Sequence, residues 1–481
     1  MRFFKDDDGA VLIYVTLIMA AFIGLGGLAL DASRAFTLRE EMQQAADAAA
    51  LAGAWQLAGT AAGAARADAA ARAVVANNQK WASGGSTAVA IGAGTAGVQF
   101  MTTVPASDDA ALVFTNAAPF DYIWVKTTSA NFDPWFMSMF GGAQSQVAAE
   151  AVARKGSSQC QVTPLFMCLP GGASFDPTAW IGHQVLMRAS QGNSWTNGNW
   201  GLLDTPGGSQ SAGALASMIA GVNGLPQCID SRGVDTKPGN VASISAAFNV
   251  RLDVYENLPG GVSYQNSPGY PPAEHVQKGT DQTASCTAQP TWVGGAIPRG
   301  FPRDADIISS NGATRFGNGQ WDCLTYWSQA HPTDTVNQPG ACSSTGGMTR
   351  YEMYLHEITT LPNKGLIPDL SGTTGDDGDP TGRSPMCYAG GSIPPTPTTI
   401  GQRINDRRIF TVAGVDCSTI AINGNTANVP VQQYLSLFLT EPAGTQGSTN
   451  GDVYMEIVGF SQAGGGGLAP IQLREWTELV R

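Results

Sequence analysis

Hydrophobic residues near the start of the chain form one uninterrupted run. Residues 10–30, AVLIYVTLIMAAFIGLGGLAL, are 21 positions without a charged side chain. A helix rises about 1.5 Å per residue, so this run is about 30 Å long, the thickness of a bilayer's hydrocarbon core. The apolar region of a cleavable signal peptide is shorter, about 7 to 15 residues, and no convincing small-x-small cleavage site precedes Asp31. The pattern therefore predicts a transmembrane helix, preceded by a cytoplasmic stub at residues 1–9.

The helical pattern continues beyond the apolar run. Five apolar residues recur at alternating intervals of four and three: Leu38, Met42, Ala45, Ala49 and Ala52. This spacing predicts a narrow apolar stripe on one face of a helix. Alanine fills 18 of the 32 positions from 45 to 76, which favours a helix and lets a neighbouring element approach closely. Two interpretations stay level: the stripe is the packing face of its own domain, or its last four residues dock against a helix of another protein.

Beyond residue 83 the period of the pattern changes to two, which is typical of strands. Four segments are predicted as strands: 97–104, 111–115, 120–128 and 145–153. Residues 135–142, WFMSMFGG, predict a short apolar helix or turn before the last of these strands. Residues 31–155 are therefore expected to form a long helix packed on a small antiparallel sheet.

The remaining residues, 156–481, also alternate in places. Further strands are predicted at 246–256, 407–417, 429–442 and 453–460. Residues 257–406 are rich in Gly, Pro, Ser, Thr and Asn, which predicts long loops of the kind that more often form binding surfaces. The predicted fold class is α+β, with a mainly-β, loop-rich domain that contains disulfides after the helix and small sheet.

Cysteine is absent before residue 160. The eight cysteines are Cys160, Cys168, Cys228, Cys286, Cys323, Cys342, Cys387 and Cys417. Their even number, wide spacing and lack of a CxxC pair favour disulfides in an oxidising compartment over a zinc or thioredoxin-type site. Eight buried, reduced thiols are the alternative. Because short loops close most easily, we expect Cys160 to pair with Cys168 and Cys323 with Cys342.

Oxidised cysteines would also settle the topology. Lys and Arg residues flank the apolar run on both sides, at positions 2, 5, 34 and 39, so the positive-inside rule leaves the orientation open. Disulfides form outside the cytoplasm. They would place the long C-terminal part of the chain there.

The charge balance argues against a nucleic-acid partner. Charged residues make up 13% of the chain, and 26 basic against 38 acidic side chains give a net charge of −12. Only seven of the basic residues are Lys, so no basic stripe is available for a phosphate backbone. We expect no nucleic acid among the partners.

No motif points to catalysis. Gly92, Gly94 and Gly97 form a GxGxxG pattern, but dinucleotide binding needs a helix to begin there, and the segment that follows alternates like a strand. We interpret it as a turn between strands and expect no nucleotide. The four histidines form no HExxH, and no serine lies in a GxSxG elbow. We therefore expect no enzymatic activity and no cofactor.

Two segments carry oxygen ligands of the kind that suit a metal ion. Asp376, Asp377 and Asp379 lie close together, but they lack the spacing and the distant Glu of an EF-hand, so a solvated loop is expected. Residues 369–373, DLSGT, resemble the DxSxS metal motif of von Willebrand A domains only faintly, with Thr at the last position. We expect no metal site in either segment.

The N-terminal segment, residues 6–54, resembles that of TadG-like proteins of the TadE/TadG family, from the tight-adherence (Flp) pilus-assembly system. The shared features are a charged stub ending at Gly9, one apolar span, Ala-Leu-Asp at 29–31, and QAADAAALA at 44–52. Weaker similarity extends to residue 155. It reappears in four short C-terminal segments: CQVTPLFMC, NWGLLD, KPGN and VYMEIVG.

The resemblance implies a single-pass protein of the bacterial inner membrane with its C-terminal bulk in the periplasm. It implies a role in pilus biogenesis as an assembly factor or a minor pilin-like subunit, with other Tad pilus-assembly components or pilin helices as partners. It does not bring a metal-dependent adhesion site, and Tyr14 stands where related prepilin-like proteins have the Glu that accompanies cleavage after Gly. The alternative from another class is an anchored periplasmic glycan-binding module or hydrolase that uses the loops of residues 257–406.

Overall fold

The computed structural model divides the chain into two units. Unit 1 comprises Met1–Gly156 and Glu475–Arg481, and unit 2 comprises Ser157–Arg474. The structure describes residues 8–57, 61–75, 78–80, 82, 87–107, 109–117, 120–160, 162–172, 175–189, 195–204, 211–222, 228–230, 233–237, 244–255, 258, 264–276, 301–330, 335–360, 385, 387–422, 425–443, 451–461 and 473–481.

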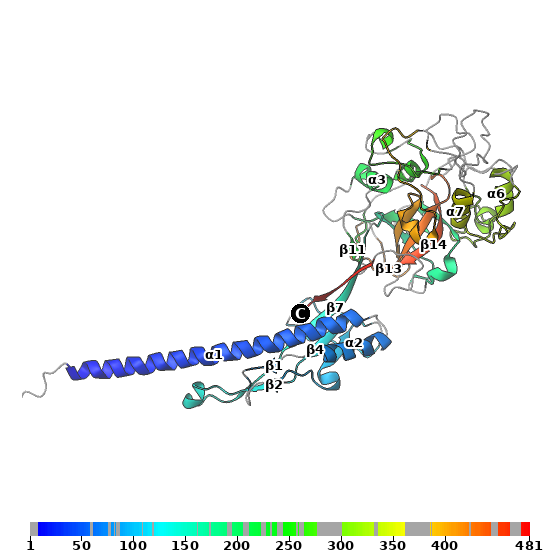
Figure 1. Ribbon diagram of the computed structural model, residues 1–481. Helices are drawn as coiled ribbons and strands as arrows, with labels where there is room; N and C mark the ends of the chain where they lie inside the picture. Colours follow the sequence, from blue (N-terminus) through cyan, green and yellow to red (C-terminus); the bar gives the residue numbers. More distant parts are fainter. Residues whose placement is uncertain are drawn as a thin grey trace, which may run out of the picture. The chain divides into compact units, whose positions relative to one another are not determined.

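Two helices form one layer of unit 1 (Figure 1). The first, α1, spans Asp8–Gln56 without interruption, and α2 (Ala61–Val74) packs against its C-terminal part. The predicted continuity of the apolar run with the alanine-rich segment is therefore confirmed. The apolar part of α1 is long enough to cross a membrane and is almost wholly exposed within the structure.

An antiparallel sheet forms the second layer of unit 1. Its strands are β3 (Val98–Met101), β4 (Tyr122–Lys126) and β7 (Glu150–Gln159), with β15 (Leu473–Leu479) paired to β7. Val98 pairs with Val125 on one side of β4, and Arg154 pairs with Tyr122 on the other. The last residues of the chain thus belong to the sheet that follows the N-terminal helix.

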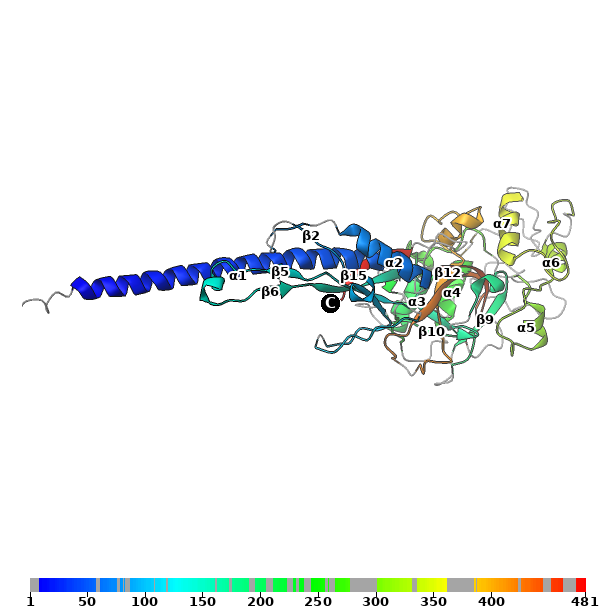
Figure 2. The ribbon, with the colours of Figure 1, turned by 90° about the horizontal axis from the view of Figure 1, so that it is seen from below.

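Smaller elements complete unit 1. They are the strand pair β1 (Asn78–Gln79) and β2 (Thr87–Ala88), the strand pair β5 (Ala130–Phe132) and β6 (Ser145–Val147), and the 3-10 turns η1 (Gly94–Ala96) and η2 (Met137–Phe140). The β5–β6 hairpin runs beside α1, with η2 at its tip (Figure 2).

Alternation along the sheet strands gives each face of the sheet its own contacts. Ile123, Val125 and Ala151 point to the face that packs on the helices, in a core that also contains the buried alanines of α1 and α2. Trp124 and Val152 point to the opposite face, where they contact Met101. A period of two in the sequence therefore becomes a sheet with one face against α1.

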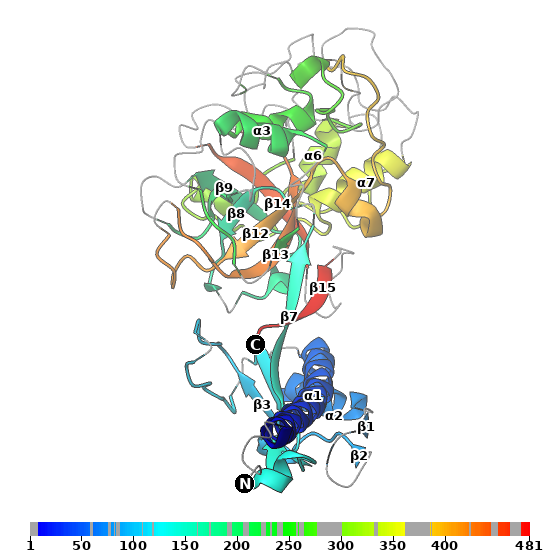
Figure 3. The same ribbon diagram turned by 90° about the vertical axis from the view of Figure 1, so that its left-hand side faces the viewer.

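Six strands of unit 2 close into a barrel (Figure 3). They are β8 (Leu165–Cys168), β9 (Gln184–Ala189), β10 (Asn199–Leu202), β12 (Ile409–Val415), β13 (Val431–Leu439) and β14 (Val453–Ser461), in the spatial order β10-β8-β12-β13-β14-β9. The β8–β12 and β9–β10 pairs are parallel, and the other pairs are antiparallel. Apolar side chains of all six strands meet in one core.

Short helices and turns surround this barrel. They are η4 (Pro177–Trp180), α3 (Ala212–Ala220), α4 (Ala246–Asn249), η6 (Val250–Leu252), η7 (Tyr264–Asn266), α5 (Ala305–Ser309), α6 (Cys323–Ala330), α7 (Arg350–Thr360) and η8 (Ile400–Asn405). A further short strand, β11 (Ile229–Asp230), pairs with the end of β7. Five of these helices and turns lie within 257–406, a segment whose composition predicts only loops.

Some of the strands predicted from the sequence are present in the structure and others are not. Most of the predicted segments contain an observed strand, and the α+β fold class is confirmed. The strand predicted at 246–256 is wrong, because this segment forms α4 and η6. Arg251 is one of the polar residues that alternate with the apolar ones in this segment. It is also buried, and it donates hydrogen bonds to the carbonyls of Ile219 and Arg407, so both sides of the segment face protein. The segment 111–115 forms only an isolated bridge between Thr115 and Phe100.

Disulfides are present in unit 2, but one predicted pairing is wrong. Cys323 bonds to Cys342 as expected, whereas Cys160 bonds to Cys228 and Cys168 to Cys417. Strand pairing explains the difference from a Cys160–Cys168 bond. Gln159 pairs with Ile229, which brings the adjoining Cys160 and Cys228 together, and Cys168 pairs with Val415, two residues before Cys417. Cys387 is also disulfide-bonded, and Cys286 lies outside the described residues.

Candidate functional site

The apolar stripe of the long helix lies inside unit 1. Met42, Ala45 and Ala49 are at most 1% exposed and pack in the core formed with the sheet, while Ala52 is half-buried. In the structure, Met42, Ala45 and Ala49 thus lie on the packing face of their own unit. Docking of the stripe against a helix of another protein stays a prediction.

The glycine-rich segment forms a tight turn before β3. The turn η1 is a three-residue 3-10 helix, and a Cβ atom on Gly97 would lie 1.8 Å from the carbonyl oxygen of Gly92. The guanidinium of Arg72 in α2 donates hydrogen bonds to the carbonyls of Gly92 and Gly94, at 2.6 and 3.1 Å. The glycines therefore serve a close turn that α2 holds. The acidic cluster Asp376, Asp377 and Asp379 and the segment 369–373 lie outside the described residues.

A clamp at Asp31 joins α1 to the tip of the β5–β6 hairpin. The Asp31 carboxylate is 3% exposed and accepts hydrogen bonds from the backbone N–H groups of Trp135, Phe136 and Met137, each at 2.8 Å. The Arg34 guanidinium lies 3.4 Å from the same carboxylate. Three N–H groups and one cation are strong compensation for a buried carboxylate.

The same clamp has an aromatic side. The Arg34 guanidinium stacks over the Trp135 ring at 3.7 Å from its centroid and lies 5.2 Å from that of Phe132. One turn earlier on α1, a Cβ atom on Gly27 would lie 2.7 Å from the Cβ of Phe136. Only glycine therefore allows the hairpin tip to approach α1 this closely.

The sequence placed Asp31 only at the end of the apolar run and did not predict its contacts. The contacting residues are more than a hundred positions away, in a segment that the sequence predicts only as a short apolar helix or turn. One signal did exist, because the first acidic residue after an apolar run must be either solvated or paired.

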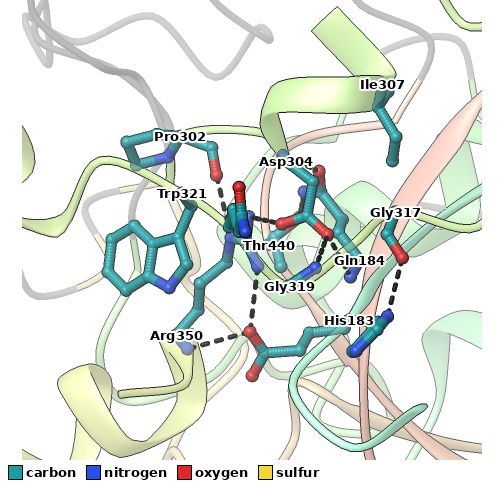
Figure 4. Close-up of polar contacts among 12 residues, drawn as sticks. His183, Gln184, Pro302, Asp304, Ile307, Gly317, Gly319, Trp321, Arg350 and Thr440 are labelled. Atoms are coloured by element: carbon teal, nitrogen blue, oxygen red, sulfur yellow. Dashed lines mark hydrogen bonds and ion pairs between the residues drawn. The ribbon is translucent and has the colours of Figure 1, made fainter. Parts of the chain in front are cut away.

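A second polar cluster lies inside unit 2, around Arg350 at the N-terminus of α7 (Figure 4). The Arg350 side chain is fully buried and forms ion pairs with Asp304 and with Glu456 of β14, the latter at 3.1 Å. Its Nε atom donates to the Pro302 carbonyl at 2.8 Å. We call Arg350, Asp304, Glu456, Gln184 and Thr440 the Arg350 cluster.

Both carboxylates of the Arg350 cluster also bind backbone N–H groups. Glu456 accepts from the first two residues of α7, Arg350 and Tyr351, at 2.8 and 3.0 Å, a favourable place for negative charge on a helix. Asp304 accepts from Gln184 and Gly319 at 3.0 and 2.8 Å. The cluster thus ties α7 and the loop that carries Asp304 to barrel strands β9 and β14.

Electrostatics of the cluster follow from burial. Burial raises the pKa of Glu456 to about 7, although the Arg350 guanidinium and the backbone N–H groups oppose the rise. Burial also raises the pKa of Glu441, against the opposing effect of Arg303, whose guanidinium chelates it. For Glu456 the cost of burying the charged form therefore outweighs the ion pair with Arg350.

The Arg350 cluster is suited to holding the fold rather than to chemistry. Each charged group in it already has protein partners, and Gln184 completes the set by donating to the Thr440 hydroxyl at 2.9 Å. Across the part of the chain that the structure describes, no group of three or more His, Cys, Asp or Glu side chains is placed to hold a metal ion.

Comparison with known families concerns the helical part of unit 1. Residues 9–77 match the family model described as putative Flp pilus-assembly TadE/G-like. The N-terminal part of the chain is TadE/G-like. No curated protein and no solved structure matches the chain.

The TadE/G-like segment has a clear structural extent. It contains nearly all of α1 and all of α2, and so it includes Gly27, Asp31 and the buried stripe. The partners of these residues, the hairpin tip and the sheet, lie beyond residue 77. The segment therefore needs the rest of unit 1 to bury its apolar stripe and to satisfy Asp31.

Proposed function

We propose that this protein is a membrane-anchored, non-enzymatic component of Flp pilus biogenesis, acting as an assembly factor or a minor pilin-like subunit. The observation that carries the proposal is the TadE/G-like match over residues 9–77, which coincides with the long helix and its companion. The N-terminal part of α1 is apolar and exposed, and its C-terminal part is packed in the core of unit 1. This division supports a role in which α1 holds the folded units at a membrane.

The proposed topology has the N-terminal stub in the cytoplasm and both units in the periplasm. Disulfides in unit 2 support this orientation, since such bonds persist in oxidising compartments. The apolar part of α1 supports a single crossing.

The proposed partner surface is the exposed face of α1 that follows the apolar run. Its side chains line an open groove along the helix: Ala29, Ala32, Ser33, Phe36, Thr37, Glu40, Glu41 and Gln44. Phe36 is 68% exposed there. Small residues beside one large aromatic side chain suit close packing of a second helix, and we propose a helix of another Tad component as the occupant.

Complementation of a deletion strain tests the proposal. The wild-type chain should restore surface piliation, and Phe36→Ala should reduce both piliation and co-purification of Tad components at normal protein level. Val113→Ala is the matched control, because Val113 is 72% exposed in the same unit and its neighbours Leu112 and Phe114 contact Trp124, on the sheet face opposite α1. Full piliation without the gene would reject the role in pilus biogenesis, whereas full piliation with Phe36→Ala would reject only the partner surface.

Alkaline phosphatase fused to the C-terminus of the full chain tests the topology, because this enzyme is active only in an oxidising compartment. We expect an active fusion in the membrane fraction. An inactive fusion, with a fluorescent cytoplasmic reporter active at the same position, would reverse the orientation.

A further inference from the structure

The tip of the β5–β6 hairpin exposes large apolar side chains. Trp135 is 60% exposed and Met139 is 80% exposed. No ionisable residue occurs from Pro134 to Ala149. A soluble surface rarely concentrates such side chains at the end of a hairpin without a partner.

The tip lies beside the end of the apolar run of α1. Asp31 holds the backbone of Trp135, Phe136 and Met137, and Phe136 packs on Gly27. Gly27 is four residues before Asp31, about 6 Å along the helix axis. Phe136 therefore lies alongside the last turn of the segment that would cross a bilayer. Figure 2 shows the β5–β6 hairpin running along α1.

The chemistry of the clamp suits the boundary between lipid and water. The Asp31 carboxylate is removed from solvent with its donors supplied by the protein, so it does not have to be hydrated at that depth. Arg34 lies one turn further from the apolar run and covers the Trp135 ring. Trp and cationic side chains are enriched at membrane interfaces, where an aromatic ring meets the headgroups.

We propose that the hairpin tip, Trp135 to Phe140, enters the outer interfacial layer of the same bilayer that α1 crosses. Met139 faces the acyl chains and Trp135 the headgroups. The occupant is lipid because the tip packs on α1 at Gly27, inside the apolar run, where Leu25 and Leu28 are 64% and 45% exposed. Unit 1 is then held at two points, and the hairpin fixes how α1 is rotated in the bilayer. This inference rests on the proposed membrane anchoring.

Depth measurement on the full-length protein tests the insertion. The protein is reconstituted into vesicles of phosphatidylethanolamine and phosphatidylglycerol, with a spin label attached through an unnatural keto amino acid so that the cysteines stay intact. Labels replace Met139, Val113 as the water-exposed control and Leu17 as the lipid-exposed control, the last being 63% exposed on α1. Collision with oxygen, which concentrates in lipid, is compared with collision with a water-soluble nickel chelate.

We expect the ratio of oxygen to nickel collisions at position 139 to exceed that at 113 several-fold and to approach that at 17. A ratio at 139 equal to that at 113 would overturn the insertion. A water-like ratio at position 17 as well would instead show that α1 is not in the bilayer, so the membrane anchoring itself would fail.

Two variants sharpen the test. Asp31→Ala removes the acceptor of three N–H groups, and it should lower the ratio at position 139 while leaving that at 17 unchanged. Unchanged values at both positions would overturn the positioning by Asp31. A photo-crosslinking benzoylphenylalanine at position 139 in cells should yield mainly lipid adducts, and a protein adduct as the main product would overturn the choice of lipid.

Discussion

The cores of the two units are built from different side chains. Alanines dominate where α1, α2 and the sheet of unit 1 meet, with Ala45, Ala49 and Ala67 among those at most 1% exposed. In unit 2 the barrel encloses large aromatic side chains such as Trp200 and Phe410. The first core brings backbones close together, and the second fills a wide interior.

Each core is consequently sensitive to a different kind of change. A Cβ atom on Gly53 of α1 would lie 2.5 Å from Ile123 Cδ1 and 3.1 Å from the Ala67 carbonyl oxygen, so little room is left for added volume where α1, α2 and β4 meet. Unit 2 instead depends on cross-links between distant segments, namely disulfides and the Arg350 cluster. Unit 1 should therefore fail by overpacking, whereas unit 2 should fail by loss of a cross-link.

The largest effect is expected from the disulfide that closes the longest loop among the three whose two cysteines the structure describes. Cys168 and Cys417 are 249 residues apart, against 19 for Cys323 and Cys342. Chain entropy gives a typical cost of about 2–5 kcal/mol for losing a native disulfide, and roughly 2 kcal/mol more for the longer of these loops. The double variant Cys168→Ala/Cys417→Ala should lower the free energy of unfolding of unit 2 more than Cys323→Ala/Cys342→Ala does.

Denaturant unfolding of the detergent-solubilised full chain, followed by hydrogen exchange of unit 2 peptides, measures this difference. Unit 1 peptides provide the internal control and should not change. Equal losses for the two double variants would show that the loop-entropy argument does not describe this unit.

Removing the central guanidinium should cost nearly as much. Arg350→Met leaves Asp304 and Glu456 buried without their cation, and breaking a buried ion pair on one side costs about 3–5 kcal/mol. Arg66→Met, on the exposed face of α2, is the matched control and should change stability by less than about 0.5 kcal/mol. A loss below about 1 kcal/mol for Arg350→Met would contradict the view that the Arg350 guanidinium holds this part of unit 2 together.

A pH dependence of unit 2 should come from the same cluster. The pKa of Glu456 rises from its ordinary 4.5 to about 7 through burial, so between these values the unfolded chain has released a proton that the folded chain keeps. Stability contributed by this group is therefore present at low pH and falls as the pH rises toward 7, by at most roughly 3 kcal/mol. Glu441 and Asp406 have pKa values raised by burial and act in the same direction.

Unfolding of unit 2 at pH 5 and at pH 7.5 tests this sign. The wild type should be more stable at pH 5, and Glu456→Gln should reduce the difference without abolishing it. Asp416, whose pKa is lowered by hydrogen bonds from Ser418, loses its contribution only at more acidic pH and does not oppose the trend in this range. Greater stability at pH 7.5 would contradict the raised pKa.

Local patterns predicted unit 1 better than unit 2 for a physical reason. The long helix and the strands β3, β4 and β7 follow from periodicity and alanine content, which act within a few residues. The disulfide partners of Cys160 and Cys168 depend on strand pairing across 68 and 249 residues, and the burial of Arg251 on carbonyl groups depends on segments more than thirty residues away. Such contacts leave no periodic signal, and neither does the pairing of Asp31 with the hairpin tip.

The smallest expected effect tests the stripe that the sequence could not assign. Ala49 is fully buried, and Ala49→Leu should overpack unit 1 by about 1–3 kcal/mol, seen as faster hydrogen exchange in peptides of α1 and the sheet. Ala69→Leu, at an exposed position of α2 in the same unit, is the matched control and should leave exchange unchanged. If Ala49→Leu instead left exchange unchanged but abolished piliation at normal protein level, the stripe would be a docking surface for a partner helix. Faster exchange with piliation reduced only in proportion to protein level would place its role in the core of unit 1, and would leave the exposed face with Phe36 as the surface for pilus partners.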